Sequence, residues 1–251
     1  MELMIPRPAV FVEEAPPEPS PDGIDCPLCQ NRGYTVTKAE DGSLLTRECA
    51  CMARRRSEKR MRRSGLGDLL RRCTFASMRC PDTWSRELKA AALRYAQDEQ
   101  SPWFYVSGRP GTGKTHACTA ICGRLLKSGA AVRYFLWREE IPVLKALVSD
   151  SPEAYAARME ELYAAPVLYI DDFCKGKVTD ADLNLAFALI NARYNRDGCR
   201  TIFSSERNLA AVGRLDEAVA SRIRQRAEGY ILAAPPGAKN WRLEGREEDH
   251  A

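Results

Sequence analysis

One eight-residue stretch, Gly108-Arg-Pro-Gly-Thr-Gly-Lys-Thr115, constrains the fold of this chain more than any other. It fits the pattern G-x-x-x-x-G-K-[ST], follows an apolar run at 103–106 and precedes a helix-like segment at 114–127. In such a loop the glycines let backbone N–H groups point at a triphosphate, while Lys114 reaches the outer phosphates and the Thr115 hydroxyl ligates magnesium. The alternative, a chance glycine-rich turn, is disfavoured by the strand before and the helix after. The stretch therefore predicts a nucleoside triphosphate site.

A second motif lies downstream, where the apolar run 167–170 ends in Asp171 and Asp172. We expect a buried parallel strand here, since open α/β sheets bind their ligands at the carboxyl ends of strands. Asp171 would hold the magnesium ion, and Asp172 would orient or deprotonate the attacking water. A plain strand followed by an acidic turn is the alternative. The candidate nucleotide-binding residues are Gly108, Pro110, Gly111, Thr112, Gly113, Lys114, Thr115, His116 and Asp171, and the catalytic candidates include Lys114, Asp171 and Asp172.

The length of 251 residues allows one α/β domain and a small appendage. No apolar run reaches the length of a membrane span, and the N-terminus lacks the pattern of a signal peptide, so we expect a cytoplasmic protein without membrane contact. The net charge is +4, but residues 52–72 contain nine Lys or Arg and only two acidic residues. Such a stretch favours an acidic partner, either nucleic acid or an acidic protein surface.

The order of motifs divides the chain into four parts. Residues 1–24, rich in Pro and Glu, are expected to be a disordered tail, and 25–64 a metal-binding unit with a basic helix. Residues 65–233 alternate strands and helices, which predicts a parallel sheet covered on both faces. Residues 234–251 are expected to be a polar tail. The expected strands are 103–107, 131–137, 166–170, 200–204 and 229–232, and the expected helices are 86–98, 114–128, 139–149, 152–164, 180–196 and 215–226.

Four of the ten cysteines form two close pairs, Cys26 with Cys29 and Cys49 with Cys51. Two pairs of soft ligands around a small hairpin suit tetrahedral zinc, and the near absence of histidine favours an all-cysteine site. A free-thiol loop and an iron–sulfur cluster are the alternatives. Because so small a unit buries little apolar surface, a bound metal would supply its stability. We expect the other six cysteines to be ordinary core or surface residues.

Taken together, these motifs resemble the DnaC/DnaI-type helicase loaders of the AAA+ class, particularly phage and prophage members. The resemblance covers about nine-tenths of the chain beyond the first tail and is carried by four motifs besides the cysteines: the phosphate loop with His116 after it, the Asp171-Asp172 strand end, Thr201-Ile-Phe-Ser-Ser205 and Ala220-Ser-Arg-Ile223. It implies an AAA+ core without a lid domain. It also implies that Arg222 acts as an arginine finger in a neighbour's active site. Arg226, four residues on, shares its helix face, and ordinary solvated arginines are the alternative.

The resemblance further implies a single-stranded DNA contact in the helical segment 138–164. Candidates for DNA contact are Trp137, Arg138, Lys145, Lys175 and Lys177. A place in the core is the alternative for Trp137, and surface charge is the alternative for each lysine. The sequence departs from the family pattern at Glu206, where many relatives have a polar sensor asparagine. A carboxylate there adds negative charge near the terminal phosphate, which puts the sensor role in doubt.

We therefore expect an ATPase that binds ATP and magnesium, assembles with itself on single-stranded DNA and delivers a replicative helicase. The alternatives are a transposition helper ATPase of the IstB type, whose members typically lack the cysteine unit, and a nucleotide-gated DNA-binding module with little hydrolysis. A phosphotransferase kinase is a further alternative, but we find no segment for the mobile lid that it would need.

Overall fold

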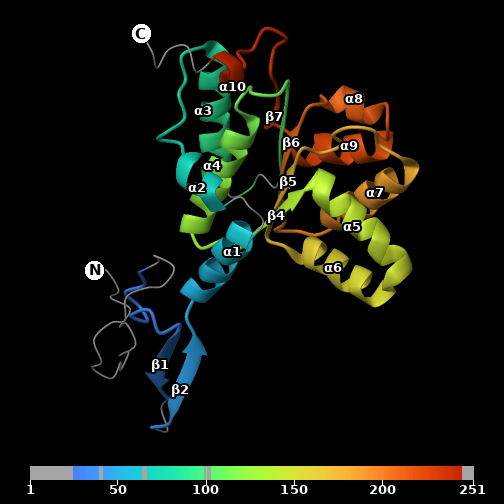
Figure 1. The fold of residues 1–251 in the computed structure, drawn as a ribbon. Coiled ribbons are helices and arrows are strands. Elements are labelled where there is room, and N and C mark those ends of the chain that lie inside the picture. The colour runs from blue at the N-terminus through green and yellow to red at the C-terminus, as the bar shows by residue number, and fades with distance from the viewer. Residues whose placement is uncertain (1–24, 40–41, 64–66, 99, 101–102, 245–251) are drawn as a thin grey trace.

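The computed structural model describes residues 25–39, 42–63, 67–98, 100 and 103–244. Its centre is a five-stranded parallel sheet with the strand order β4-β5-β6-β3-β7 (Figure 1). The expected strands are confirmed to within two residues at either end, and the largest difference is the later start of the short last strand. The strands are β3 (Trp103–Ser107), β4 (Val132–Leu136), β5 (Val167–Asp171), β6 (Arg200–Ser205) and β7 (Ile231–Ala233).

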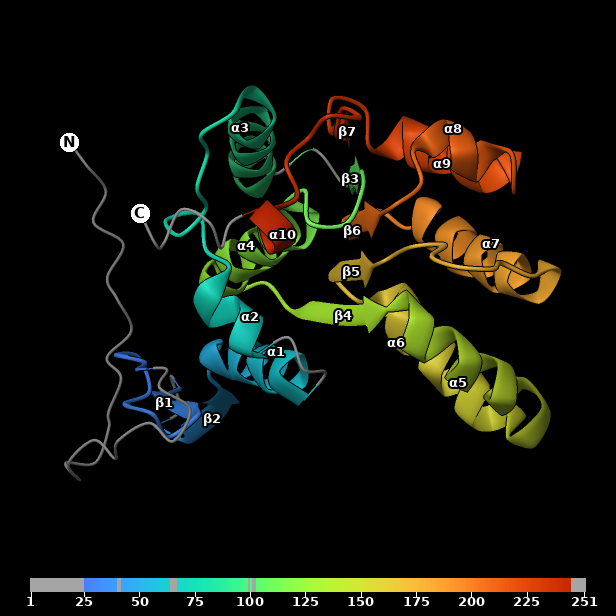
Figure 2. The ribbon, with the colours of Figure 1, turned by 45° about the horizontal axis from the view of Figure 1, so that its top comes forward.

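Helices cover both faces of this sheet, as the alternation predicts (Figure 2). On one face, α3 (Thr83–Gln97) and α4 (Lys114–Lys127) pack against Phe104 and Val106 of β3. The neighbouring residues Trp103 and Tyr105 point to the other face, because side chains alternate along a strand. The helices of that face are α5 (Trp137–Asp150), α6 (Pro152–Ala164), α7 (Asp180–Tyr194), α8 (Leu209–Gly213) and α9 (Glu217–Arg226). All five strands of the sheet contribute side chains to these two cores, β7 through the partly buried Leu232. The two cores fix the ends of the strands around the site described below.

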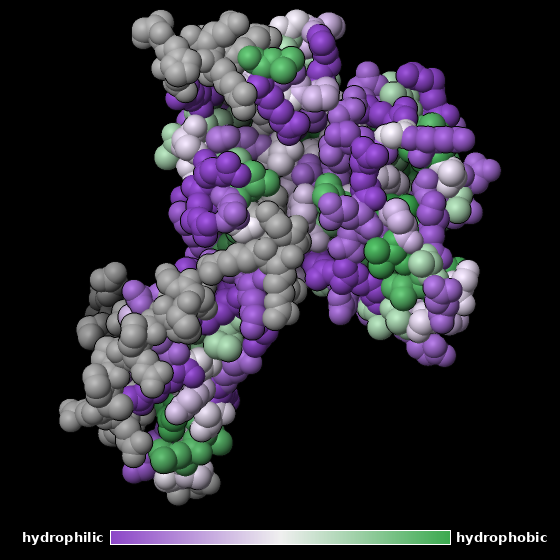
Figure 3. All heavy atoms as spheres, viewed as in Figure 1, coloured by the Kyte–Doolittle hydropathy of each residue, from purple (hydrophilic) through white to green (hydrophobic). Residues whose placement is uncertain are grey.

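The N-terminal unit stands apart from the sheet. Strands β1 (Tyr34–Lys38) and β2 (Leu44–Glu48) form an antiparallel hairpin, and α1 (Cys51–Arg63) leads from it to α2 (Gly67–Arg72). Helix α1 lies beside β4, the outer strand of the sheet (Figure 2). Apolar residues gather over the hairpin (Figure 3), where Leu44 is 66% exposed. The expected disordered tail, residues 1–24, lies outside the described residues.

The segment after β7 folds back over the sheet instead of leaving it. We expected a polar tail from residue 234, but the chain turns toward α4 and ends its described part in α10 (Trp241–Glu244). The short helices α2, α8 and α10 were not expected, because four to six residues are too few to show a helical period. Among the helices that the structure describes, none has the length and apolar character needed to cross a membrane.

Candidate nucleotide-binding site

The predicted phosphate loop connects β3 to α4. Its last glycine, Gly113, precedes α4 with φ at +88°, a conformation that side chains other than glycine rarely adopt. Lys114, the first residue of α4, is only 6% exposed, and its ammonium lies inside the loop. Its Nζ donates hydrogen bonds to the carbonyl oxygens of Gly108 and Arg109, at 2.7 and 2.8 Å. Burial lowers the pKa of Lys114, and the nearby carboxylates of Glu206 and Asp172 oppose that shift.

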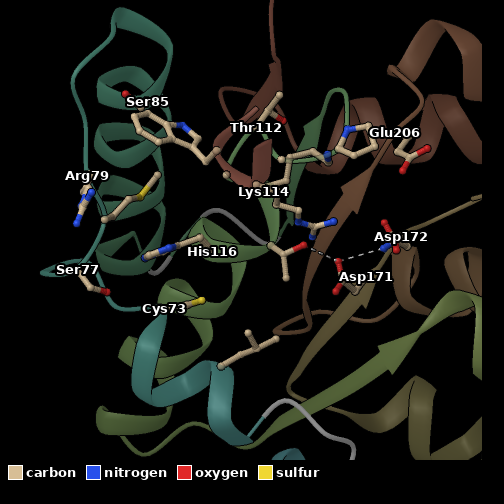
Figure 4. Close-up of a pocket in the computed structure, with 18 of the residues that line it drawn as sticks. Cys73, Ser77, Arg79, Ser85, Thr112, Lys114, His116, Asp171, Asp172 and Glu206 are labelled. Atoms are coloured by element: carbon tan, nitrogen blue, oxygen red, sulfur yellow. Dashed lines mark hydrogen bonds between the residues drawn. The ribbon is translucent and has the colours of Figure 1, made fainter. Parts of the chain in front are cut away.

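Asp171, at the end of β5, lies opposite the start of α4 (Figure 4). The Thr115 hydroxyl donates to Asp171 Oδ1 at 3.4 Å, so the two proposed magnesium ligands are neighbours. Both are oxygen donors of the kind that magnesium prefers, and the pair fits such an ion. Two further donors to this carboxylate were not expected from the sequence: the Tyr134 hydroxyl, 3.0 Å from Oδ2, and the Ser204 hydroxyl, which donates to Oδ1. Neither has a local signal, because β4 and β6 become neighbours of β5 only in the assembled sheet.

Asp172 follows with φ at +55°. Its backbone N–H donates to Asp171 Oδ1 and to the Ser204 hydroxyl, both at 3.1 Å, while its own carboxylate accepts a bond from Lys175 at 3.0 Å. Lys175 also forms an ion pair with Glu206 at 2.9 Å. Burial acts to lower the pKa of Lys175, but the hydrogen bonds to Glu206 and Asp172 outweigh it and raise that pKa. Lys175, a candidate for DNA contact, therefore lies in the nucleotide site.

These groups surround a cavity of about 560 Å³ (Figure 4). The residues from Pro110 to His116 and Asp171 line it, whereas Gly108 takes part through its carbonyl. The His116 ring contacts the Thr74 carbonyl at 3.0 Å and so joins α4 to the segment after α2. The lining residues that the sequence did not indicate for this site are Leu69, Cys73, Ser77, Met78, Arg79, Ser85, Tyr134, Leu136, Lys175, Trp241 and Arg242.

The C-terminal segment closes one side of the loop. The Trp241 backbone N–H donates to the Gly111 carbonyl at 3.1 Å, and the Lys239 ammonium lies over the Trp241 ring, 4.7 Å from its centroid. A Cβ atom on Gly111 would meet Asn240 Oδ1 at 1.8 Å, so a residue other than glycine at 111 would displace this segment. The segment that we expected to be a polar tail is thus part of the site. No local pattern in this segment specified a contact with the loop.

The four N-terminal cysteines converge as the spacing predicts. The Sγ atoms of Cys26 and Cys49 lie 3.7 Å apart, those of Cys29 and Cys51 3.5 Å apart, and all four lie within 4.8 Å of one another. Sulfurs bound to one tetrahedral zinc ion at about 2.3 Å would be roughly 3.8 Å apart, whereas a disulfide needs about 2.05 Å. Burial acts to raise the pKa of Cys26, but the backbone N–H groups of Cys29 and Leu28 lower it to about 7. These donors favour a thiolate at Cys26, whereas burial raises the pKa of Cys49 and that of Cys51. The close spacing of the four sulfurs is what fits a zinc ion.

Arg222, the expected arginine finger, lies on α9 and is not one of the described residues that line this cavity. Its guanidinium donates to Asn191 Oδ1 and to the Ala218 carbonyl, both at 3.0 Å. It also stacks over the rings of Phe187 and Tyr194, at 5.1 and 5.6 Å. The side chain is thus held against α7.

The other candidates for DNA contact lie in three kinds of environment: Trp137 is buried in the core, Lys145 forms an ion pair, and Arg138 and Lys177 are exposed. Trp137 is 3% exposed and packs edge-to-face on Phe173 at 4.9 Å, so the ring lies in the core and does not reach a base. Packing of the Trp137 ring against Phe173 in the core keeps it away from the surface. Lys145 pairs with Asp182 at 2.7 Å, and Arg138 is exposed. Lys177 is exposed as well and does not line the cavity.

Comparison with known proteins agrees with this geometry. The model of the family described as IstB-like ATP binding protein matches residues 35–227. The phage-like element PBSX protein XkdC of Bacillus subtilis (strain 168) is 27% identical over 251 residues, which covers 94% of this chain and 92% of that protein. The replicative helicase loader DnaC of Escherichia coli (strain K12) is 28% identical over 130 residues, 51% of this chain and 52% of DnaC.

Solved structures show the same fold at low sequence identity. The crystal structure of the DnaC helicase loader matches with a TM-score of 0.52 and 20% identity, covering 64% of this chain and 96% of that one. The crystal structure of DnaI matches with a TM-score of 0.54 and 18% identity, covering 68% and 93%. The expected AAA+ P-loop fold is therefore confirmed.

Proposed function

The chain belongs to the family of IstB-like ATP-binding proteins, and we propose that it hydrolyses ATP to place a replicative helicase on single-stranded DNA. The observation that carries the hydrolysis proposal is the meeting of Lys114 and Thr115 with Asp171 and Asp172 around one cavity. This set contains a phosphate-binding cation, two oxygen ligands for magnesium and a second carboxylate. These are the parts that phosphoryl transfer needs.

In the proposed reaction ATP occupies the cavity with its outer phosphates at Lys114 and the N-terminus of α4. Thr115 and Asp171 would hold magnesium, which neutralises phosphate charge when bound. Asp172 orients a water molecule and accepts its proton. The water oxygen bonds to the terminal phosphorus as the bond to the bridging oxygen breaks, and ADP leaves with that electron pair. Tyr134 and Ser204 keep the Asp171 carboxylate fixed during this step.

We assign Arg222 to the site of a neighbouring copy, where it would stabilise the charge of the transferred phosphate. Its present contacts are a hydrogen bond to an amide oxygen, another to a carbonyl and two ring contacts. None of these four contacts is with a carboxylate. Moving the guanidinium to a phosphate would therefore not require any of them to give up an ion pair. ATP hydrolysis in one subunit would then depend on contact with its neighbour.

We assign the N-terminal unit to the helicase. The zinc site would hold the hairpin rigid, while the exposed Leu44 and Leu45 and the basic helix α1 would give an apolar surface beside a positive one. The similarity to proteins named helicase loader supports this assignment. A transposition helper of the IstB type is the second candidate, and the name of the matching family favours it.

One experiment tests hydrolysis. Lys114→Ala should abolish ATP turnover and binding, measured by phosphate release and by titration with a fluorescent nucleotide. Lys127→Ala, which changes an exposed lysine at the other end of the same helix, should leave both unchanged. Nucleotide affinity that survives in the Lys114 variant would contradict the site.

A second experiment separates the two candidate functions. The whole protein should capture a purified replicative helicase, and a Leu44→Ser/Leu45→Ser variant should lose capture while keeping its ATP affinity. If the intact chain instead stimulates a transposase and ignores the helicase, the transposition helper is the correct function.

A further inference from the structure

The cation Lys175 and the anion Glu206 line the cavity proposed to hold ATP and have no role in the reaction as described so far. Both line the same cavity as Lys114. Lys175 Nζ lies 3.0 Å from Asp172 Oδ2 and 2.9 Å from Glu206 Oε1, so one ammonium connects the ends of β5 and β6. The three side chains are partly buried, between 26% and 33% exposed, which makes such pairs stronger than those on an open surface.

Other contacts hold the backbone around this ammonium. The Phe173 N–H donates to the Ser204 carbonyl at 2.8 Å, and the Ser205 hydroxyl donates to the Phe173 carbonyl at 2.8 Å. Arg207 donates to the carbonyls on either side of Lys175, those of Cys174 and Gly176, both at 2.9 Å. The turn that carries Lys175 is therefore fixed to the end of the strand that carries Glu206.

The charges of these side chains and the number of N–H donors on Lys175 limit the function that the cluster can have. Without Lys175, the Glu206 carboxylate would add a third negative charge to those of Asp171 and Asp172 and would repel a triphosphate. Lys175 cancels that charge. Its ammonium has three N–H donors, and the two carboxylates accept two of them. The third donor is left for a ligand in the cavity.

We propose that Lys175 binds the terminal phosphate of ATP, and that Glu206 and Asp172 position its ammonium for this contact. Lys175 then distinguishes ATP from ADP, which lacks that phosphate, whereas Lys114 serves both nucleotides. Glu206, whose carboxylate alone would be unfavourable beside a phosphate, acts through Lys175 as a positioning residue. The inference rests on the nucleotide site of the proposed function but not on hydrolysis.

The test compares the affinity for ADP with that for a non-hydrolysable ATP analogue, both with magnesium, by competition against a fluorescent nucleotide. Lys175→Met should lower the preference for the ATP analogue about 10- to 100-fold, the range of one charge-assisted hydrogen bond, with ADP affinity within about twofold of wild type. The retained ADP affinity reports that the variant folds. Lys177→Met, two residues away and outside the cavity, is the matched control and should change neither affinity.

Two further variants, Glu206→Gln and Lys175→Met/Glu206→Gln, test whether Lys175 binds the phosphate or only neutralises the charge of Glu206. Glu206→Gln should lower the preference by a smaller factor, since this residue acts through the Lys175 ammonium. Lys175→Met/Glu206→Gln should recover only the part of the preference that the unpaired Glu206 charge removes, and it should stay well below the wild type. Recovery of the wild-type preference in the double variant would show that Lys175 only neutralises Glu206. An unchanged preference in Lys175→Met, or faster ATP turnover, would also overturn the proposal. If the wild type hydrolyses no ATP, the proposed function fails, yet the affinity ratio still tests Lys175.

Discussion

Replacing Arg193 with methionine should destabilise the whole fold, because this arginine is fully buried and connects three elements. Its guanidinium donates five hydrogen bonds, of which three go to carbonyls at the end of α6. The acceptors there are Leu162, Tyr163 and Ala165. The last carbonyls of a helix have no partner within it, and a cation there also complements the helix dipole. Burial lowers the pKa of Arg193 to about 10, so the group is still charged at neutral pH.

The size of the loss follows from the acceptors left behind. Methionine fills much of the volume but donates no hydrogen bond, and each buried acceptor without a partner costs about 1–3 kcal/mol. Removing the buried charge offsets part of this loss of stability, because the Arg193 guanidinium no longer has to be desolvated on folding. We expect the free energy of unfolding to fall by about 3–5 kcal/mol, which lowers Tm by roughly 10 °C in a chain of this size.

The assay is thermal and urea unfolding followed by circular dichroism at neutral pH. Arg196→Met is the matched control, since that side chain is 46% exposed and pairs with the exposed Glu160 at 3.5 Å. The control should change the free energy of unfolding by less than about 0.5 kcal/mol. A fall of less than about 1 kcal/mol in the Arg193 variant would refute the reasoning, because the carbonyls of α6 would then have found other partners.

Three further predictions concern the proposed sites. Gly111→Ala should weaken ATP affinity by displacing the C-terminal segment, and adding Asn240→Gly should recover part of the loss; no recovery would mean that loop strain alone is responsible. One zinc per chain should be found by atomic absorption and should disappear in Cys26→Ser, whereas zinc retained there would exclude the four-sulfur site. Arg222→Ala should bind ATP normally and hydrolyse it poorly, and mixing it with Lys114→Ala should restore some turnover. Wild-type turnover by the Arg222 variant alone would exclude the finger.

The sequence predicted those parts of the site that neighbouring residues create. The loop from Gly108 to Thr115 carries its own glycines, its lysine and the start of its helix, so the local pattern determines the backbone. Asp171 and Asp172 were predicted from a short apolar run that ends in carboxylates. The cysteine pairs were predicted to meet because a hairpin of about twenty residues brings its two ends together.

The remaining parts depend on which elements become neighbours in three dimensions. Tyr134 and Ser204 donate to Asp171 because β5 lies between β4 and β6. Lys175 and Glu206 form a pair for the same reason, although in the sequence Lys175 resembled ordinary surface charge and Glu206 was a departure at the sensor position. Strand order is set by the packing of whole helices on the two faces of the sheet, and a local pattern does not encode it. The closing of the loop by Trp241 is the longest-range case, because a segment that is polar in sequence is held in place by a backbone hydrogen bond.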